Sequence, residues 1–249
     1  LPKLATPLWP RIVLRGLILC SAYLAFILSI AAMPIANAVA IYFTMPFFVG
    51  GLAGPFLGEH VPLYRWIAIV TGFVGVIVMV RPGVEAFEPA SLLALYSAFG
   101  YAVGQMMGRS LAQKVEPLVI ANWQNAIYLA VAIIMGAFLM AADVSGISHK
   151  SLVFLTRPFA WPTLTHFVGL SAVGLLAAFA MMSFISAYKL AESNFVAPFE
   201  YSGMIWAVGF GLIFFNDFPD AWTWAGIAIV ASAGLFMLAM DRRAKPQSP

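Results

Sequence analysis

The chain of 249 residues is 63% hydrophobic and only 9% charged, with a formal net charge of +3. Ordinary soluble domains carry about 25% charged residues, so this composition excludes a separate soluble domain. It predicts an all-α, polytopic membrane protein, with the lipid bilayer as one of its partners. The basic residues are spread between apolar stretches, which gives no reason to expect nucleic-acid binding. The one cysteine, Cys20, lies in an apolar run, so no disulfide, cysteine metal site or cofactor is expected.

Eight apolar stretches predict eight membrane spans. Each is long enough to cross most or all of a hydrocarbon core of about 30 Å, at about 1.5 Å per helical residue. Arg15 lies near the entry of the first span, where its long side chain is expected to reach the membrane surface. In chain order the spans are Val13–Met33, Ala36–Leu57, Tyr64–Val80, Ser91–Met107, Leu118–Ala142, Leu164–Tyr188, Asn194–Phe215 and Ala221–Met240.

An even number of spans puts both chain ends on the same side of the membrane. With both ends in the cytosol, only three of the 13 basic residues lie outside, namely Arg81, Lys150 and Arg157. The other ten face the cytosol, as the excess of lysine and arginine in cytosolic loops requires. Residues 241–249 are then a cytosolic tail.

The seventh predicted span carries Glu200 two residues after Pro198. A carboxylate inside the bilayer is costly, so it normally lines a protein cavity or has a partner. Proline removes a backbone donor and loosens the helix just where the carboxylate lies. The alternative is that Glu200 reaches the nearer membrane surface. Lys189 and Glu192, three residues apart at the end of the sixth span, are expected to form a surface pair.

The fourth span is the most polar of the eight. Tyr101 and Gln105 are four residues apart, hence on one helical face, and Tyr96 lies near that face. This pattern is typical of a wet or substrate-lining surface. Hydrogen bonding between helices explains it equally well.

An internal repeat relates the second span to the seventh at an offset of 157 residues. Asn37 corresponds to Asn194, and Phe43 corresponds to Glu200. The seventh span comes five spans after the second, which is an odd number, so the two copies lie inverted in the membrane, which is the architecture of secondary transporters. The fold class is therefore an inverted-repeat helical bundle. Residues 1–83 form a first repeat with three spans and residues 84–240 a second with five, so two spans are expected to be missing before Leu1.

The segment from Asn37 to Gly83 resembles the EamA repeat of the drug/metabolite transporter superfamily. It has a central Pro46, a Leu57–Glu59 turn reading LGE, and a following span with Gly72 and Gly75. The second copy departs from this pattern by having Asn216 and Asp217 in place of Gly-Glu. The resemblance implies ten spans in two inverted five-helix repeats, an inner-membrane location and transport of small metabolites. Eight of those spans are present here.

The resemblance and the residues together favour a secondary active transporter that works by alternating access and is coupled to protons or to exchange. The APFEY stretch, Ala197–Tyr201, resembles a subset of the family that carries bulky metabolites such as S-adenosylmethionine or riboflavin. Candidate substrate-binding or coupling residues are Glu200, Tyr201, Tyr96, Tyr101, Gln105, Tyr42 and Thr44. The expected partner is a small-molecule substrate, and a second copy of the chain is a further candidate.

Two other functional classes are alternatives to transport. A membrane enzyme is disfavoured because the histidines are scattered and no HExxH, GxSxG or phosphate-loop pattern occurs. A non-transporting membrane subunit or an inactive truncated paralogue is the alternative that stays open.

Overall fold

The computed structural model describes residues 6–57, 61–81, 88–141, 149–157, 160–190, 202–216 and 218–244. All regular secondary structure within these ranges is helical, which confirms the predicted class. The helices are α1 (Trp9–Ile30), α2 (Ile35–Tyr42), α3 (Met45–Leu57), α4 (Leu63–Val80), α5 (Ala90–Ala112), α6 (Pro117–Ala141), α7 (Lys150–Leu155), α8 (Leu164–Leu190), α10 (Ser202–Phe215) and α11 (Ala221–Ala244).

Within the described residues, which exclude 194–201 of the predicted seventh span, the helices follow the predicted spans closely, with two differences. The second span is divided into α2 and α3, and the short helix α7 forms within a stretch expected to be a loop. Among the described residues, five helical stretches are long and apolar enough to cross a membrane, and two shorter apolar helices lie within α8 and α10. The remaining predicted span is α5, which carries Tyr96, Tyr101 and Gln105 among its apolar residues.

Pro46 explains why the second span is interrupted. Proline has no N–H, so the carbonyl of Tyr42, four residues earlier, cannot receive its helical hydrogen bond. The chain instead makes a tight turn, in which the Thr44 N–H donates to the Ile41 carbonyl at 3.0 Å. The Thr44 hydroxyl donates to the same carbonyl at 2.7 Å. The result is a discontinuous helix with its break at Phe43 and Thr44.

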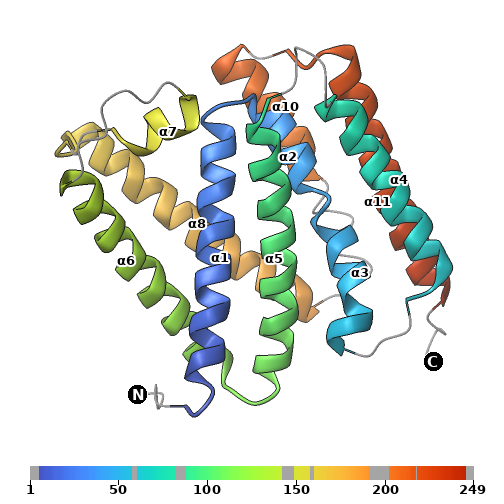
Figure 1. Ribbon diagram of the computed structural model, residues 1–249, viewed down its shortest axis with the longest axis horizontal. Helices are drawn as coiled ribbons and strands as arrows, with labels where there is room; N and C mark the ends of the chain where they lie inside the picture. The colour runs from blue at the N-terminus through green and yellow to red at the C-terminus, as the bar shows by residue number, and fades with distance from the viewer. Residues whose placement is uncertain are drawn as a thin grey trace.

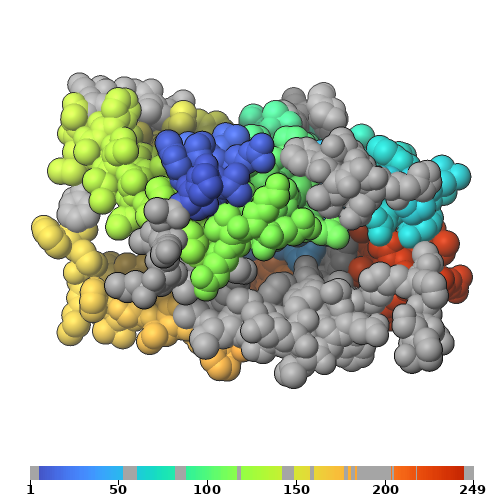
Figure 2. All heavy atoms as spheres, turned by 90° about the horizontal axis from the view of Figure 1, so that it is seen from below, coloured from blue at the N-terminus to red at the C-terminus, as the bar shows by residue number. Residues whose placement is uncertain are grey.

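The helices form two layers, with the start of α1 and the end of α11 at the same end of the bundle (Figure 1). One layer holds α6, α1, α5 and the α3–α4 pair, while α8, α10 and α11 lie behind it. Figure 2, seen from the end that carries the termini, shows α6, α1 and α5 on one side and α8 and α11 on the other. Large apolar side chains on the outer faces, such as Phe138 and Phe179, are exposed, as a surface facing lipid requires.

A buried cluster joins the two layers on the side where α4 meets α11. It includes Ile41 of α2, Phe47 of α3, Ala68 of α4 and Val230 of α11, all fully buried. Two glycines bring α4 and α11 into backbone contact at this point. A Cβ added to Gly226 would lie 2.7 Å from the Gly75 carbonyl oxygen.

We expect Gly226→Ala to lower the thermal stability of the protein in detergent. The added methyl group overpacks the helix contact, which typically costs about 1–3 kcal/mol. The matched control is Gly136→Ala on α6, because a Cβ there meets no atom within 4 Å. We expect the control to leave the melting temperature unchanged or slightly raised, since alanine is the better helix former. Equal melting temperatures for the two variants would contradict the contact.

Two ionic contacts hold α4 to α11, one at each end. Near the chain termini, the Arg65 Nε and the Tyr64 hydroxyl both donate to Asp241 Oδ1, at 3.0 and 2.6 Å. At the opposite end, Arg81 Nη2 lies 2.6 Å from Asp220 Oδ2. Asp220 also caps α11, because its Oδ1 accepts the Thr223 N–H at 2.8 Å. The hydrogen bonds from Thr223, and then the charge of Arg81, lower the pKa of Asp220 below its usual value.

The lowered pKa of Asp220 predicts how the Arg81–Asp220 ion pair responds to pH. Because the pKa of Asp220 is lower in the folded protein than in the unfolded chain, its charged form stabilises the fold at pH values above the unfolded-state pKa of about 3.9. This stabilisation is lost as the pH falls through the folded-state pKa. We expect the difference in melting temperature between wild type and Asp220→Asn to stay constant from pH 5 to pH 8. It should shrink below about pH 4. Asparagine keeps the helix cap, so the comparison isolates the charge. A difference that changed between pH 6 and pH 8 would mean that another group controls this contact.

Candidate functional site

Three of the residues predicted to line a substrate path lie together. Gln105 Nε2 donates to the Tyr101 hydroxyl at 3.0 Å, along the polar face of α5. The Tyr101 ring packs edge-on against Tyr42 of α2, with 5.9 Å between the ring centroids. Tyr42 is the last residue of α2, so this aromatic and amide group lies beside the break between α2 and α3.

The other predicted residues are placed differently. The Tyr96 hydroxyl shares a hydrogen bond of 2.8 Å with Ser21 of α1, which is the contact between helices that the alternative interpretation expects. Thr44 is fully buried at the helix break, and its hydroxyl donates a hydrogen bond to the Ile41 carbonyl. Glu200 and Tyr201 lie outside the described residues.

Arg15 is the residue that the sequence analysis missed. It was expected to reach the membrane surface, and that expectation is wrong because the residue is only 9% exposed. Its Nε donates to the Gly104 carbonyl at 2.9 Å, and its Nη1 donates to Gln124 Oε1 at 2.8 Å. Both partners are uncharged, and no carboxylate in the described part of the chain pairs with Arg15. A buried cation of this kind inside a span is costly and usually functional.

A row of glycines on α5 makes room for α1 and for the arginine. Gly100, Gly104 and Gly108 are four residues apart, so they share one helical face. A Cβ at Gly100 would meet Ala22, one at Gly104 would meet Leu19, and one at Gly108 would lie 2.9 Å from Arg15 Nε. The sequence analysis did not use this spacing, which is a signal for a closely packed neighbour of the fourth span. The glycine spacing alone does not identify Arg15 as the side chain that packs against Gly108.

A cavity of about 730 Å³ opens beside Arg15, between α1, α5 and α6. Its volume falls within the range of about 300–1,000 Å³ that small-molecule sites occupy. Arg15 lies in the first two turns of α1, so the cavity is toward the end of the bundle that carries the termini (Figure 1). Its polar lining consists of two cations and three amides, namely Arg15, Arg109, Gln105, Gln124 and Asn125.

The chemistry of this lining favours a solute rich in acceptor groups. Guanidinium groups donate to carboxylate, phosphate or carbonyl oxygens, and amides can donate to or accept from a polar ring. Gln105 lines the cavity and also donates a hydrogen bond to Tyr101, so this one residue links the cavity wall to the aromatic group beside the helix break.

An all-helical bundle with exposed apolar outer faces defines a polytopic membrane protein, and this one contains a polar, cation-lined cavity. The chain belongs to the EamA-like transporter family, whose sequence profile matches residues 2–81. It is 31% identical over 224 residues to a riboflavin transporter of Rhizobium johnstonii, covering 89% of this chain and 68% of that protein. Membership of this family places the chain among transporters rather than enzymes.

Two further relatives carry different names. An S-adenosylmethionine uptake transporter of Rickettsia bellii is 26% identical over 232 residues, which cover 93% of this chain and 73% of that protein. The pseudopaline exporter CntI of Pseudomonas aeruginosa is 25% identical over 226 residues, covering 90% of this chain and 73% of the exporter. No solved structure matches the chain.

Proposed function

We propose that the protein is a secondary active transporter that carries a small polar metabolite across the bacterial inner membrane by alternating access. The observation that supports this most strongly is the buried Arg15, held by two uncharged partners beside a cavity of metabolite size. Its relatives are named for riboflavin, S-adenosylmethionine and pseudopaline, all polar solutes. A bulky solute with anionic or carbonyl groups is therefore the proposed substrate class.

The packing of the helices supports the division into two inverted repeats, residues 1–83 and residues 84–240. At the offset of 157 residues, Met45 corresponds to Ser202, and these residues begin α3 and α10. The second span packs against α10, and α4 packs along α11, so each pair takes one helix from each proposed repeat. Contacts of this kind are expected around the pseudo-two-fold axis of an inverted-repeat carrier. Alternating access would then be the rocking of one repeat against the other.

Glu200 is the proposed coupling residue, with Tyr201 beside it at the substrate. Gly203 of α10 lies three residues further on, and a Cβ added there would lie 3.2 Å from the ring of Phe43. Phe43 directly follows Tyr42, so this end of α10 lies beside the group formed by Tyr42, Tyr101 and Gln105. A protonatable carboxyl within this membrane span would let proton binding bias the carrier between its two states.

We further propose that both chain ends are cytosolic, because they lie at the same end of the bundle and this orientation keeps most basic residues inside. The Arg15 cavity would then open toward the cytosol.

The experiment that tests the proposed function compares metabolites inside and outside bacteria that carry either the native gene or an empty vector. We expect one class of polar solute to change its distribution when the gene is present. Equal distributions in both strains across many growth conditions would overturn the transporter proposal. That result would favour a non-transporting membrane subunit or an inactive truncated paralogue.

A further inference from the structure

The start of α1 and the end of α5 border a groove of about 270 Å³. Figure 2 shows both segments on the face of the bundle that carries the termini. No described residue of α6 lines this α1–α5 groove, whereas α6 forms one wall of the cavity beside Arg15, so the two sites are distinct. The polar lining of the groove is Arg11, Ser110 and Lys114, and its apolar lining includes Leu14 and Met107.

The α1–α5 groove lies on the outer side of the two helices. Leu14 is 53% exposed, as an apolar side chain that faces lipid is. Leu14 and Ser21 are seven residues apart, hence on one face of α1. Met107 and Tyr96 are eleven residues apart, or about three turns, hence on one face of α5. The Ser21 and Tyr96 hydroxyls share a hydrogen bond across these two faces, and Tyr96 is exposed as well. The groove therefore opens toward lipid along the seam between α1 and α5.

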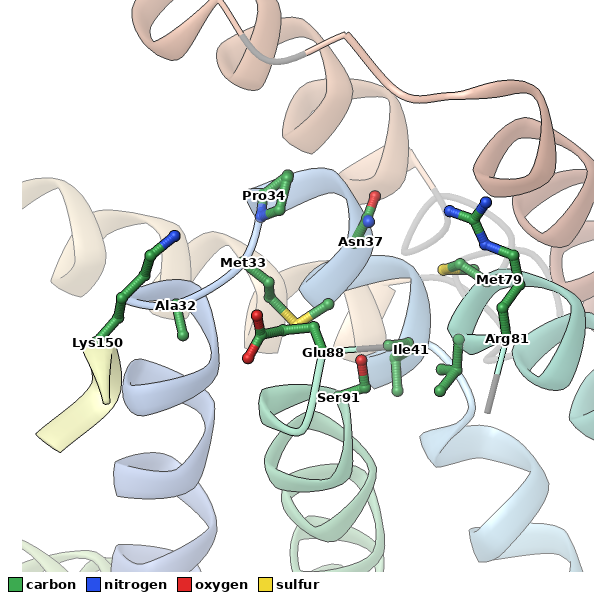
Figure 3. Close-up of a pocket in the computed structure, with 11 residues that line it drawn as sticks. Ala32, Met33, Pro34, Asn37, Ile41, Met79, Arg81, Glu88, Ser91 and Lys150 are labelled. Carbon is green, nitrogen blue, oxygen red and sulfur yellow. The ribbon is translucent and has the colours of Figure 1, made fainter. Parts of the chain in front are cut away.

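The charges that line the α1–α5 groove are both positive. Arg11 and Lys114 are exposed, and within the described part of the chain neither side chain makes a hydrogen bond or an ion pair. The cavity at the opposite end of the bundle has the same volume but a mixed lining, with Glu88 between Lys150 and Arg81 (Figure 3). No described carboxylate lines the α1–α5 groove, so its cations attract an anion from outside the chain.

Tryptophan places these cations at the level of the lipid headgroups. Trp9 is exposed at the start of α1, and exposed tryptophans of membrane proteins favour the boundary between lipid and water. Arg11 follows two residues later, about 3 Å along the helix axis. Lys114 lies just after the end of α5, in the turn that leads to α6. Leu14 lies about 4.5 Å deeper than Arg11, on the side of the acyl chains.

We propose that the α1–α5 groove binds one anionic phospholipid. The lipid phosphate takes the charges of Arg11 and Lys114 and accepts a hydrogen bond from the Ser110 hydroxyl. One acyl chain lies against Leu14 and Met107 in the apolar part of the groove. Basic pockets between membrane helices bind lipid headgroups in this way on the cytosolic side of a membrane. Assignment of the lipid to the cytosolic leaflet rests on the proposed orientation of the chain, whereas the binding itself does not depend on transport.

The experiment measures lipid binding to the purified protein, expressed from its native gene and held in detergent, by native mass spectrometry. The two lipid probes are dioleoyl phosphatidylglycerol, which is anionic, and dioleoyl phosphatidylcholine, which has the same chains and no net charge. We expect the anionic lipid to bind about tenfold more tightly, because two cations face its phosphate. Glycerol 3-phosphate carries the charge without the chains and should not displace the bound lipid. Displacement by glycerol 3-phosphate at similar concentrations would make the groove a site for soluble anions and would overturn the proposal.

Variants assign the lipid preference to this groove. Arg11→Gln and Lys114→Gln should each reduce the preference for phosphatidylglycerol severalfold, and the double variant should bind the two lipids equally. Both positions are exposed, so the melting temperature without added lipid should match wild type. The matched control is Arg243→Gln, which removes an exposed cation near the end of α11 and should keep the full preference. Equal binding of the two lipids by wild type, or an unchanged preference in the double variant, contradicts the lipid site. Either result leaves the transport proposal intact, because no transport is measured.

Discussion

Arg15→Gln is expected to reduce the initial rate of transport about tenfold to a hundredfold. Hydrogen bonds to charged groups contribute about 1.5–3 kcal/mol, and the cavity would lose its most deeply buried donor. Glutamine is neutral and shorter, so it can replace neither the charge nor the fork that joins Gly104 to Gln124. The measurement is the rate for the solute found by the metabolite comparison, normalised to the amount of protein in the membrane.

Three further variants make this result interpretable. Arg243→Gln removes a cation from an exposed position near the end of α11 and should leave the rate unchanged. Arg15→Lys keeps the charge and loses the fork, so an intermediate rate is expected. Gly108→Ala pushes a methyl group against Arg15 Nε and should slow transport while keeping every polar group. If Arg15→Gln transports as fast as Arg243→Gln, the cavity beside Arg15 is not part of the transport path.

A purely structural role for Arg15 makes a different prediction. The Arg15→Gln protein would then be less abundant in the membrane and would melt at a lower temperature. Its transport rate per molecule would stay near that of wild type. A loss of rate per molecule at an unchanged melting temperature supports the role in the cavity.

Glu200→Gln is the second substitution with a large expected effect. If Glu200 carries the coupling proton, the neutral amide cannot cycle between charged and uncharged forms, and concentrative transport should be lost at every pH. Glutamine keeps the size of the side chain, so packing should be preserved. The measurement is the solute gradient that cells build at several external pH values, at equal membrane levels of the two proteins.

The matched control for Glu200 is Glu192→Gln, which lies eight residues earlier where the sequence predicts a surface pair with Lys189. We expect this variant to transport like wild type. A Glu200→Gln variant that builds the same gradient as wild type at all pH values would make Glu200 a structural residue. A variant that equilibrates the solute but no longer concentrates it would support the coupling role most directly.

The sequence alone was enough to place the helices along the chain. A membrane span needs about 20 consecutive apolar residues, and such a run can be recognised from the local sequence alone. For this reason the ends of α4 and the start of α5 fall within one residue of the predicted bounds. The break in the second span was not predicted, because Pro46 was taken only as part of the family resemblance, although its missing backbone donor is a property of the residue itself.

Only the tertiary structure decided which polar groups meet. Arg15 bonds partners 89 and 109 residues further along the chain, so nothing near it in the sequence distinguishes a buried guanidinium from one at the membrane surface. Tyr42 of α2 and Tyr101 of α5 likewise meet through a contact between distant segments of the chain. Hydropathy reports how much of a helix is apolar. Which face of a helix turns inward depends on contacts between distant segments, and those contacts form the cavity beside Arg15.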